Sequence, residues 1–489
     1  MDQDKRLLDD FLALFLAIIA FYAATYYVFN MSIPIGDLNI INSIKSKLAS
    51  SAGYPQLLYP TFMYIFYEKL FLFSQFFGNE LGLELTSRVI NCTLYSINGI
   101  LFYHLSKRYL SSKWNILGIF LFFSSPALFY SAIEIRPAGL LVLELLIITL
   151  VVEKLIESPK IKIYHFLSGI ISGLAIATKF NPSYFFIYLF GILYLYLNQS
   201  RLPKKIDLSL AAFGLIISLP IGWPTIWGFG NYFNTPGVSD NFYFSNFPGF
   251  GKAIEETWSF PYGKYSMGLV IILSFAAGIL NYILFWVGAA LRIYSKRFLF
   301  IWIFHIPIYL ILIFNFTLYR MSHMFTLAVP AIILGATILL RYLTHRWGPK
   351  IFIPLLFPLI ILSLIQTPIQ ADIASGFAQI VKQEIPTKFT DEGPLLLITN
   401  YNNNEIKGDQ IDLYIQNKRP KTIIALDSFL YNYCKYKNNK IYIRHCSFFK
   451  KLLNGQAGYR SEVFSEINFP LKRFFDFDFL KFYLLTRID

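Results

Sequence analysis

The sequence predicts a helical protein with many membrane spans, followed by a small α/β domain. Two observations carry this prediction. Of the 489 residues, 55% are hydrophobic and only 15% are charged, and the mean hydropathy is +0.50, so the chain is far more apolar than a soluble domain. The apolar residues also gather in runs close to the length that crosses a bilayer, about 20 helical residues.

We predict eleven spans, some of them short. They lie at residues 7–29, 87–105, 114–131, 137–153, 164–179, 183–198, 207–228, 266–291, 298–318, 322–340 and 351–369. The first run follows Lys5 and Arg6 and has no small-residue cleavage site. We therefore expect it to stay in the membrane as an anchor rather than to be removed as a signal peptide.

Positive charges between the runs predict the orientation. Alternate loops each carry three cations, namely Lys107, Arg108 and Lys113; Lys154, Lys160 and Lys162; Arg201, Lys204 and Lys205; Arg292, Lys296 and Arg297; and Arg341, Arg346 and Lys350. Such loops stay on the cytoplasmic side. We expect a cytoplasmic N-terminus and an external C-terminal region, and this pattern explains the net charge of +14 without a nucleic-acid partner.

Two external stretches precede the C-terminal region. The first, residues 30–86, holds Asp37, a helical pattern at 39–50 and an aromatic run at 59–77, which suits helices lying in the membrane interface. A twelfth span over the aromatic run is the alternative, and it would move the C-terminus inside. The second, residues 229–265, is rich in Gly, Pro, Asn and aromatics, which predicts either a lid or an ordered surface loop.

The composition changes near Gln370. We predict a transmembrane domain at residues 1–369 and an external α/β domain at 370–489, because the strand-like runs LLLITN, TIIAL, KIYIRH and FYLLTRI alternate with a helical pattern. Cys434 and Cys446 both lie in this region. An external location permits a disulfide between them, although spacing alone leaves free thiols equally open.

Ionisable residues gather near the external ends of the predicted spans, where they are costly and mark candidate functional sites. They are Asp37, Arg88, Glu134, Arg136, Lys179, Arg320 and His323. A single Arg at a helix end is often only an anchor in the interface. Four cations beside an acid favour an anionic ligand such as a phosphate.

Individual residues in this set allow more than one interpretation. Asp37 suits a helix N-cap or a general base beside a bound phosphate, and we predict the base. Glu134 and Arg136 form either a local ion pair or an anion-binding site together with the start of the helix at Pro137. Glu144 lies two turns deeper, and we interpret it as a hydrogen-bonded structural acid.

Several stretches in a fixed order resemble the GT-C superfamily of polyprenyl-phosphate-sugar-dependent glycosyltransferases, in its protein O-mannosyltransferase and lipid A aminoarabinose transferase branch. They are the acid-bearing first external loop, SRVINCTLYSINGILFYHLSKRYL, SSPALFYSAIEIRPAGLLVLELL and LSGIISGLAIATKFNPSYFF. The resemblance covers roughly the first 200 residues and, more weakly, residues 320–330. It implies interfacial helices in the first external loop and an acid there that acts on the acceptor.

The resemblance transfers roles to matching positions only. Asp37 takes the place of one acid of the family's Asp-Glu pair, and Tyr54 begins YPQL where His-Pro-Pro-Leu is usual. Arg88 matches the Arg that opens the family's second span. Arg136 matches the Arg of the family's Arg-Pro-Asp motif, and Lys179 matches the Lys of its Thr-Lys motif. Leu38 stands in place of the second acid and Ala138 in place of a carboxylate. No cofactor is firmly implied, and both a divalent metal ion and the donor sugar stay open.

The resemblance implies a hexosyl- or pentosyltransferase of cell-envelope glycan biosynthesis in the bacterial inner membrane. Its donor is a polyprenyl-phosphate sugar, its acceptor a lipid, glycan or protein hydroxyl, and its transfer inverting. Arg88, Arg136, Lys179 and Arg320 would hold the phosphate, with Glu134, His323 and Tyr54 also binding substrate. The alternatives are a flippase for a lipid-linked saccharide, although the repeated halves common in transporters are not evident, and a non-catalytic GT-C-like subunit.

Overall fold

The computed structural model of the chain describes sixteen stretches. They are residues 2–30, 62–76, 78, 82–133, 137–179, 183–199, 203–223, 277–308, 326–348, 361, 380, 384, 395–397, 411–426, 440–466 and 481–488. The chain divides into two compact units. Within these stretches, the helices up to residue 348 belong to the first unit, and the four-stranded sheet with its two helices belongs to the second.

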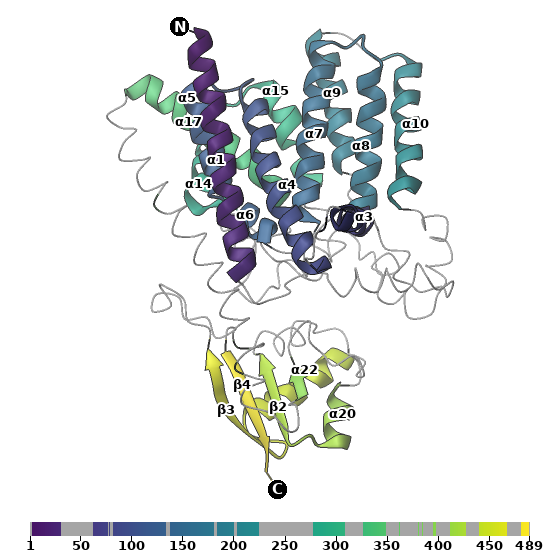
Figure 1. Cartoon of the computed structure of the whole chain (residues 1–489), viewed down its shortest axis with the longest axis vertical. Coiled ribbons are helices and arrows are strands. Elements are labelled where there is room, and N and C mark those ends of the chain that lie inside the picture. The colour runs from purple at the N-terminus through teal and green to yellow at the C-terminus, as the bar shows by residue number, and fades with distance from the viewer. Residues whose placement is uncertain are drawn as a thin grey trace. The chain divides into compact units, whose positions relative to one another are not determined.

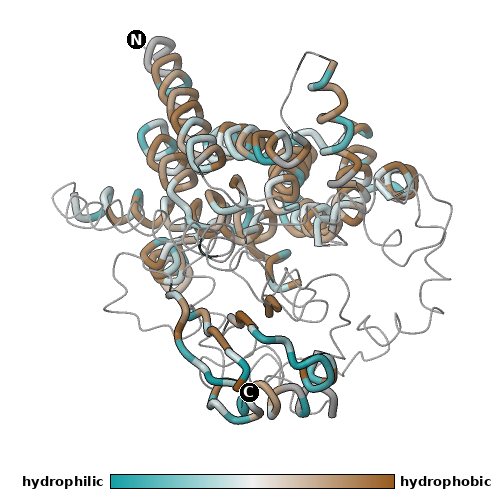
Figure 2. Tube along the Cα trace, turned by 60° about the horizontal axis from the view of Figure 1, so that its bottom comes forward, coloured by the Kyte–Doolittle hydropathy of each residue, from teal (hydrophilic) through white to brown (hydrophobic). Residues whose placement is uncertain are grey.

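The first unit is a bundle of apolar helices (Figure 1). Its longer helices are α1 (Asp2–Asn30), α3 (Phe62–Phe76), α4 (Leu83–Ser106), α5 (Ser112–Phe123), α6 (Pro126–Ile133), α7 (Ala138–Glu157), α8 (Ile163–Lys179), α9 (Ser183–Gln199), α10 (Lys205–Gly222), α14 (Ile279–Ala290) and α17 (Val329–Trp347). A short α15 (Lys296–Phe298) continues into the π-helix η3 (Leu299–Ile303). Figure 2 shows hydrophobic residues along most of the helix that begins at the N-terminus.

Three of these helices are long and apolar enough to cross a membrane by themselves, over Leu7–Phe29, Lys205–Gly222 and Thr326–Trp347. The pair α5 and α6 adds a fourth if it counts as one span. This supports a membrane protein, but it does not confirm eleven spans. Helices α4, α7, α8 and α9 nevertheless coincide with predicted runs to within a few residues. The run at 351–369 lies outside the stretches listed above except for residue 361.

The predicted span at 114–131 is not one straight helix, because the helix breaks at Ser124 and Ser125. Helices α5 and α6 meet there at an angle of 54°. Pro126, the first residue of α6, lacks a backbone N–H and disfavours helical geometry in the residue before it. The run therefore folds as two short helices.

Helix α3 lies across the bundle, and Figure 1 shows it nearly end-on while its neighbours run lengthwise. Its 15 residues extend about 22 Å, short of the roughly 30 Å hydrocarbon core. Tyr67 is fully buried and packs with Leu94 of α4 and Leu140 of α7. The aromatic run thus forms a transverse helix, which fits the interfacial prediction and not a twelfth span.

Small residues allow α8 and α10 to approach closely. A Cβ atom added at Gly169 of α8 would lie 1.9 Å from the carbonyl oxygen of Ala211, and one at Gly214 of α10 would lie 2.4 Å from that of Phe166. Gly173 faces Ser218 in the same way. Packing of small residues, rather than apolar burial, drives helix association in lipid, so this pair depends on its glycines.

We expect Gly169→Ala to destabilise the bundle by about 1–3 kcal/mol, because its methyl group would overlap backbone that cannot move without separating two helices. Gly118→Ala is the matched control, since its Cβ would meet Phe102 at an ordinary 3.6 Å. Thermal unfolding of both variants in the same detergent measures the difference. Equal midpoints would contradict the tight α8–α10 contact.

Charged residues connect the helices at the bundle end opposite the start of α4. Glu153 of α7 is fully buried and accepts hydrogen bonds from Tyr109 and Arg297. Arg108 lies 3.7 Å from the same carboxylate and also pairs with Glu157. Arg341 of α17 donates to the backbone oxygen of Tyr109 at 2.8 Å. We call this set the charged clamp: Arg108, Tyr109, Glu153, Glu157, Arg297 and Arg341.

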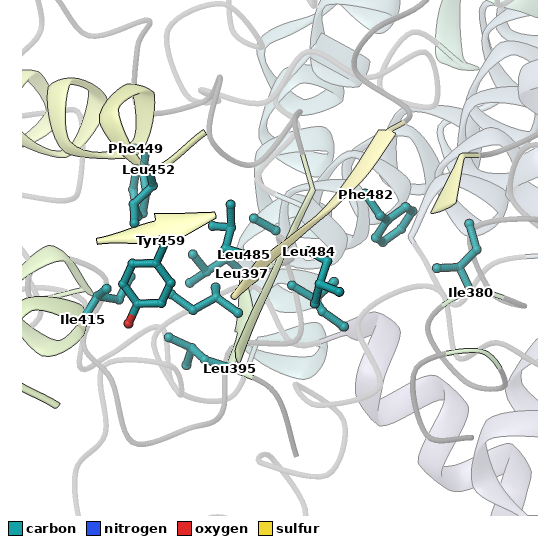
Figure 3. Close-up of a cluster of buried hydrophobic side chains, with 13 residues drawn as sticks. Ile380, Leu395, Leu397, Ile415, Phe449, Leu452, Tyr459, Phe482, Leu484 and Leu485 are labelled. Atoms are coloured by element: carbon teal, nitrogen blue, oxygen red, sulfur yellow. The ribbon is translucent and has the colours of Figure 1, made fainter. Parts of the chain in front are cut away.

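The second unit contains a mixed sheet in the order β1-β2-β4-β3. Strand β1 (Leu395–Leu397) pairs in parallel with β2 (Thr422–Leu426), and α20 (Ile411–Lys418) lies between them in sequence. Strands β4 (Lys481–Arg487) and β3 (Tyr459–Glu466) continue the sheet antiparallel. Figure 3 shows the core side chains, which include Ile415 of α20 and Phe449 and Leu452 of α22 (Lys440–Leu453).

The predicted α/β class of this unit agrees with the structure, but one element is wrong. KIYIRH begins helix α22 and is not a strand. The apolar residues Phe449 and Leu452 recur three residues apart and are buried, which is the period of a helix face. The strand prediction was based on the β-branched residues at the start of the segment alone. Strand β3, which carries three charged residues among eight, was missed.

One cysteine of the predicted pair falls within the described part of the second unit. Cys446 is disulfide-bonded, whereas Cys92 of α4 is free and buried. Cys434 lies outside the described residues. Disulfides persist mainly in oxidising compartments, and the external location of this unit stays a prediction.

A buried ion pair joins the two helices of the second unit. Asp412 of α20 is fully buried, and its Oδ2 lies 2.5 Å from Nε of Arg444 in α22. Nη2 of Arg444 donates to Oδ1 at 3.0 Å, so the guanidinium contacts both carboxylate oxygens. Oδ1 also accepts from the backbone N–H of Leu413.

We expect Asp412→Asn to destabilise the second unit by about 1–3 kcal/mol, because the half-exposed Arg444 loses a charged, bidentate acceptor. Glu462→Gln, at an exposed position on β3, is the control and should change stability by less than about 0.5 kcal/mol. Pulse proteolysis of the full chain, scored by fragments cut within residues 395–488, reports on this unit. Indistinguishable cleavage midpoints would show that the pair contributes little.

Candidate active site

Eight residues were predicted for the site, and the structure describes one of them in full. Arg88 has a defined side chain, and Lys179 has a defined backbone as the last residue of α8. Asp37, Tyr54, Glu134, Arg136, Arg320 and His323 lie outside the described residues. Several of these residues directly precede or follow a described helix in the sequence. The ends of those helices therefore define the candidate site.

Arg88 is buried against the end of α6. Only 3% of its surface is exposed, and its Nε donates to the carbonyl oxygen of Ile133 at 3.1 Å. Ile133 is the last residue of α6, where carbonyl groups lack helical partners and the helix dipole favours a cation. Arg88 thus fixes the chain one residue before Glu134, which makes it a positioning residue for the predicted Glu134 and Arg136 pair.

The next helix starts directly after that pair. Pro137 is the N-cap of α7, and no side chain in the described part of the chain caps this helix start. The sequence had predicted Pro137 one position later, in the first turn. The first backbone N–H groups of α7 have no acceptor within the helix, and such groups favour anions. The carbonyl of Gly139 in the same turn accepts a 2.9 Å hydrogen bond from Asn98 of α4.

Two buried asparagines on α4 anchor neighbouring elements, and sequence reasoning missed both. Asn98 holds the first turn of α7, and Asn91 accepts a hydrogen bond from the hydroxyl of Tyr67 in α3. Asn91 and Asn98 are seven residues apart and almost completely buried, so they share one face of the helix. Amides seven residues apart in an otherwise apolar run were the available signal.

A buried carboxyl links α7 to α8 next to Lys179. Glu144 is 5% exposed, and its Oε1 accepts a 2.7 Å hydrogen bond from the hydroxyl of Thr178. Its Oε2 has no hydrogen-bond partner in the part of the chain that the structure describes. The sequence prediction of a hydrogen-bonded acid is thereby confirmed, and Thr178 is the partner that the sequence did not reveal.

A third hydrogen bond brings in α9. The hydroxyl of Tyr184, in the first turn of α9, donates to the carbonyl oxygen of Leu141 in α7. Figure 1 shows that α4 and α7 start, and α8 ends, at the same end of the bundle. Three segments that carry predicted cations, around Arg88, before Pro137 and at Lys179, are thus held together at that end by buried hydrogen bonds.

Metal ligation has no support within the described ranges. No group of three or more His, Cys, Asp or Glu side chains in those ranges is placed to hold an ion. His305 is buried, with 1% of its surface exposed. The start of α7, the buried hydrogen-bonding groups and the cations predicted next to them in the sequence together suit an anionic ligand.

Comparison with known families agrees with this interpretation. Residues 70–225 match the family described as dolichyl-phosphate-mannose-protein mannosyltransferase. The matched range covers about a third of the chain and includes Arg88, Glu134, Arg136, Glu144 and Lys179. No curated protein matches the chain. Over residues 70–225 the resemblance to the GT-C superfamily is therefore confirmed, through its dolichyl-phosphate-mannose-protein mannosyltransferase family.

Proposed function

We propose that this protein is a membrane glycosyltransferase that moves a sugar from a polyprenyl-phosphate donor to an acceptor hydroxyl at the outer face of the membrane. The match of residues 70–225 to a mannosyltransferase family carries the proposal. The apolar helices long enough to cross a membrane support an integral membrane location. The buried hydrogen bonds at the ends of α4, α6, α7, α8 and α9 support a preorganised site there.

The proposed chemistry is a single displacement at the anomeric carbon. The carboxylate of Asp37 takes the proton of the acceptor hydroxyl, and the acceptor oxygen attacks as the bond from the anomeric carbon to the phosphate oxygen breaks. The electron pair leaves with the polyprenyl phosphate. One in-line displacement inverts the configuration of the sugar.

The predicted cations act on the leaving group. Arg136 and Lys179, and Arg320 from later in the chain, stabilise the negative charge that develops on the phosphate. Buried Arg88 holds the end of α6, so we assign it a positioning role rather than direct phosphate contact. Glu134, His323 and Tyr54 line the same site in this proposal.

Asp37→Asn should lower the turnover number about 10²- to 10⁴-fold, because general-base catalysis contributes rate factors of that size. The assay uses membranes with a radiolabelled polyprenyl-phosphate sugar and measures label transferred to the acceptor. Near-normal transfer by Asp37→Asn would remove the base assignment. Label that crosses the bilayer while still attached to the lipid would instead favour a flippase.

Asp10→Asn is the matched control for this experiment. Asp10 lies on α1 and pairs with Lys107 and the hydroxyl of Tyr103 at a partly exposed position. Surface ion pairs contribute little to stability, so this variant should transfer sugar at close to the parent rate. A comparable loss in both variants would point to misfolding rather than to chemistry.

Glu144→Leu should raise the KM for the donor about 2- to 10-fold, because the lost hydrogen bond to Thr178 loosens the end of α8 that carries Lys179. Glu144→Gln keeps a carbonyl acceptor for Thr178 and should restore most of the donor affinity. The pair of variants separates a positioning role from a chemical one. A large loss of kcat with unchanged KM in Glu144→Gln would contradict the positioning role.

A further inference from the structure

A pocket lies at the opposite end of the bundle from the candidate active site. It has a volume of about 580 Å³ and lies between the start of α5, the residues that follow α14 and the last turns of α17. That volume is in the range of sites that bind small ligands. None of the residues that line it is acidic.

The lining changes from apolar to basic along α17. Ile338, together with Ile293 from beyond α14, lines the apolar part, and Arg341 and His345 line the polar part. Ile338 and His345 are seven residues apart, about 10 Å along the helix. A ligand that fits this gradient has an apolar part and an anionic part.

A hydrogen bond to the protein backbone orients Arg341, and the other N–H groups of its guanidinium can bind a ligand. Its Nη1 donates to the backbone oxygen of Tyr109 at 2.8 Å, which uses one of five N–H groups on the guanidinium. Trp114 and Tyr342 add aromatic side chains to the lining, and Arg346 donates to the hydroxyl of Tyr342 at 2.9 Å. Trp and Tyr beside Arg are typical of the level of lipid headgroups in a membrane.

The charge around the pocket is positive. Lys113 and Arg292 adjoin lining residues in the sequence. Arg341 is connected through Tyr109 to Glu153, and Glu153 and Glu157 are paired with Arg108 and Arg297 in the charged clamp. Basic pockets between membrane helices on the cytoplasmic side bind anionic lipid headgroups.

We propose that this pocket binds the headgroup of an anionic phospholipid. The phosphate is held by Arg341 and His345, the glycerol region lies against Trp114 and Tyr342, and the acyl chains leave past Ile293 and Ile338. The pocket lies next to the end of the candidate span Thr326–Trp347, where a lipid headgroup would be located. This site is independent of the proposed sugar transfer.

The test compares lipids on the purified, delipidated full chain. We expect phosphatidylglycerol to raise the thermal midpoint of the parent by a few degrees through preferential binding to the folded state, and phosphatidylcholine to raise it less. Native mass spectrometry should show one phosphatidylglycerol retained. Equal shifts from the two lipids would overturn the proposal, as would a full shift from glycerol 3-phosphate alone.

Variants locate the binding to the pocket. Arg341→Gln and His345→Ala should each lose at least half of the shift caused by phosphatidylglycerol. Lys160→Gln removes one exposed charge outside the pocket lining and should keep the shift. Arg341→Gln also loses the hydrogen bond to Tyr109 and could therefore fail to fold. In that case His345→Ala alone tests the proposal. Retention of the full shift by His345→Ala would overturn the proposal.

Discussion

The helical unit depends on the cost of leaving a polar group unpaired in an apolar interior. Such a group costs about 1–3 kcal/mol in protein interiors and more in lipid. Each buried polar side chain that we describe at the candidate active site makes at least one hydrogen bond to another helix. Arg88 holds α6, Asn98 holds α7, Thr178 holds Glu144, and Tyr184 holds Leu141. The positions of the helix ends follow from these bonds.

The two ends of the bundle solve this problem differently. The described hydrogen bonds at the end with the candidate active site go mostly to backbone carbonyls. At the other end, the buried carboxylate of Glu153 accepts hydrogen bonds from Arg297 and Tyr109. The charged side chains that the structure pairs with one another thus lie at the end opposite the candidate active site.

Much of the helical unit could be predicted from the sequence, because apolar runs such as the one that became α7 are long and their ends carry charge. The break between α5 and α6 was not predicted, although Ser124, Ser125 and Pro126 interrupt the apolar run and a proline disfavours helical geometry in the residue before it. In the second unit, KIYIRH has strand-like composition but packs through Phe449 and Leu452 farther along the same helix. Tertiary packing overrode local preference there.

The site was predictable as a set of residue types and not as a set of contacts. The Thr178 and Lys179 pair was visible in the sequence, yet the carboxyl that orients it lies on another helix, 34 residues earlier. Long-range hydrogen bonds of this kind leave no periodic signal. Asn91 and Asn98 did leave one, as amides spaced seven residues apart on a single face.

The charged clamp has a consequence for how the protein is made. Arg297 follows Glu153 by 144 residues, so the ribosome completes α7 long before the main cationic partner of its buried acid exists. Among the described residues synthesised before Glu153, Arg108 and Tyr109 are the ones that contact its carboxylate. The first helices are therefore inserted before this ion pair can form, and the synthesis of residue 297 and then of Arg341 completes the charged clamp. Assembly of the clamp thus follows the order in which the chain is made.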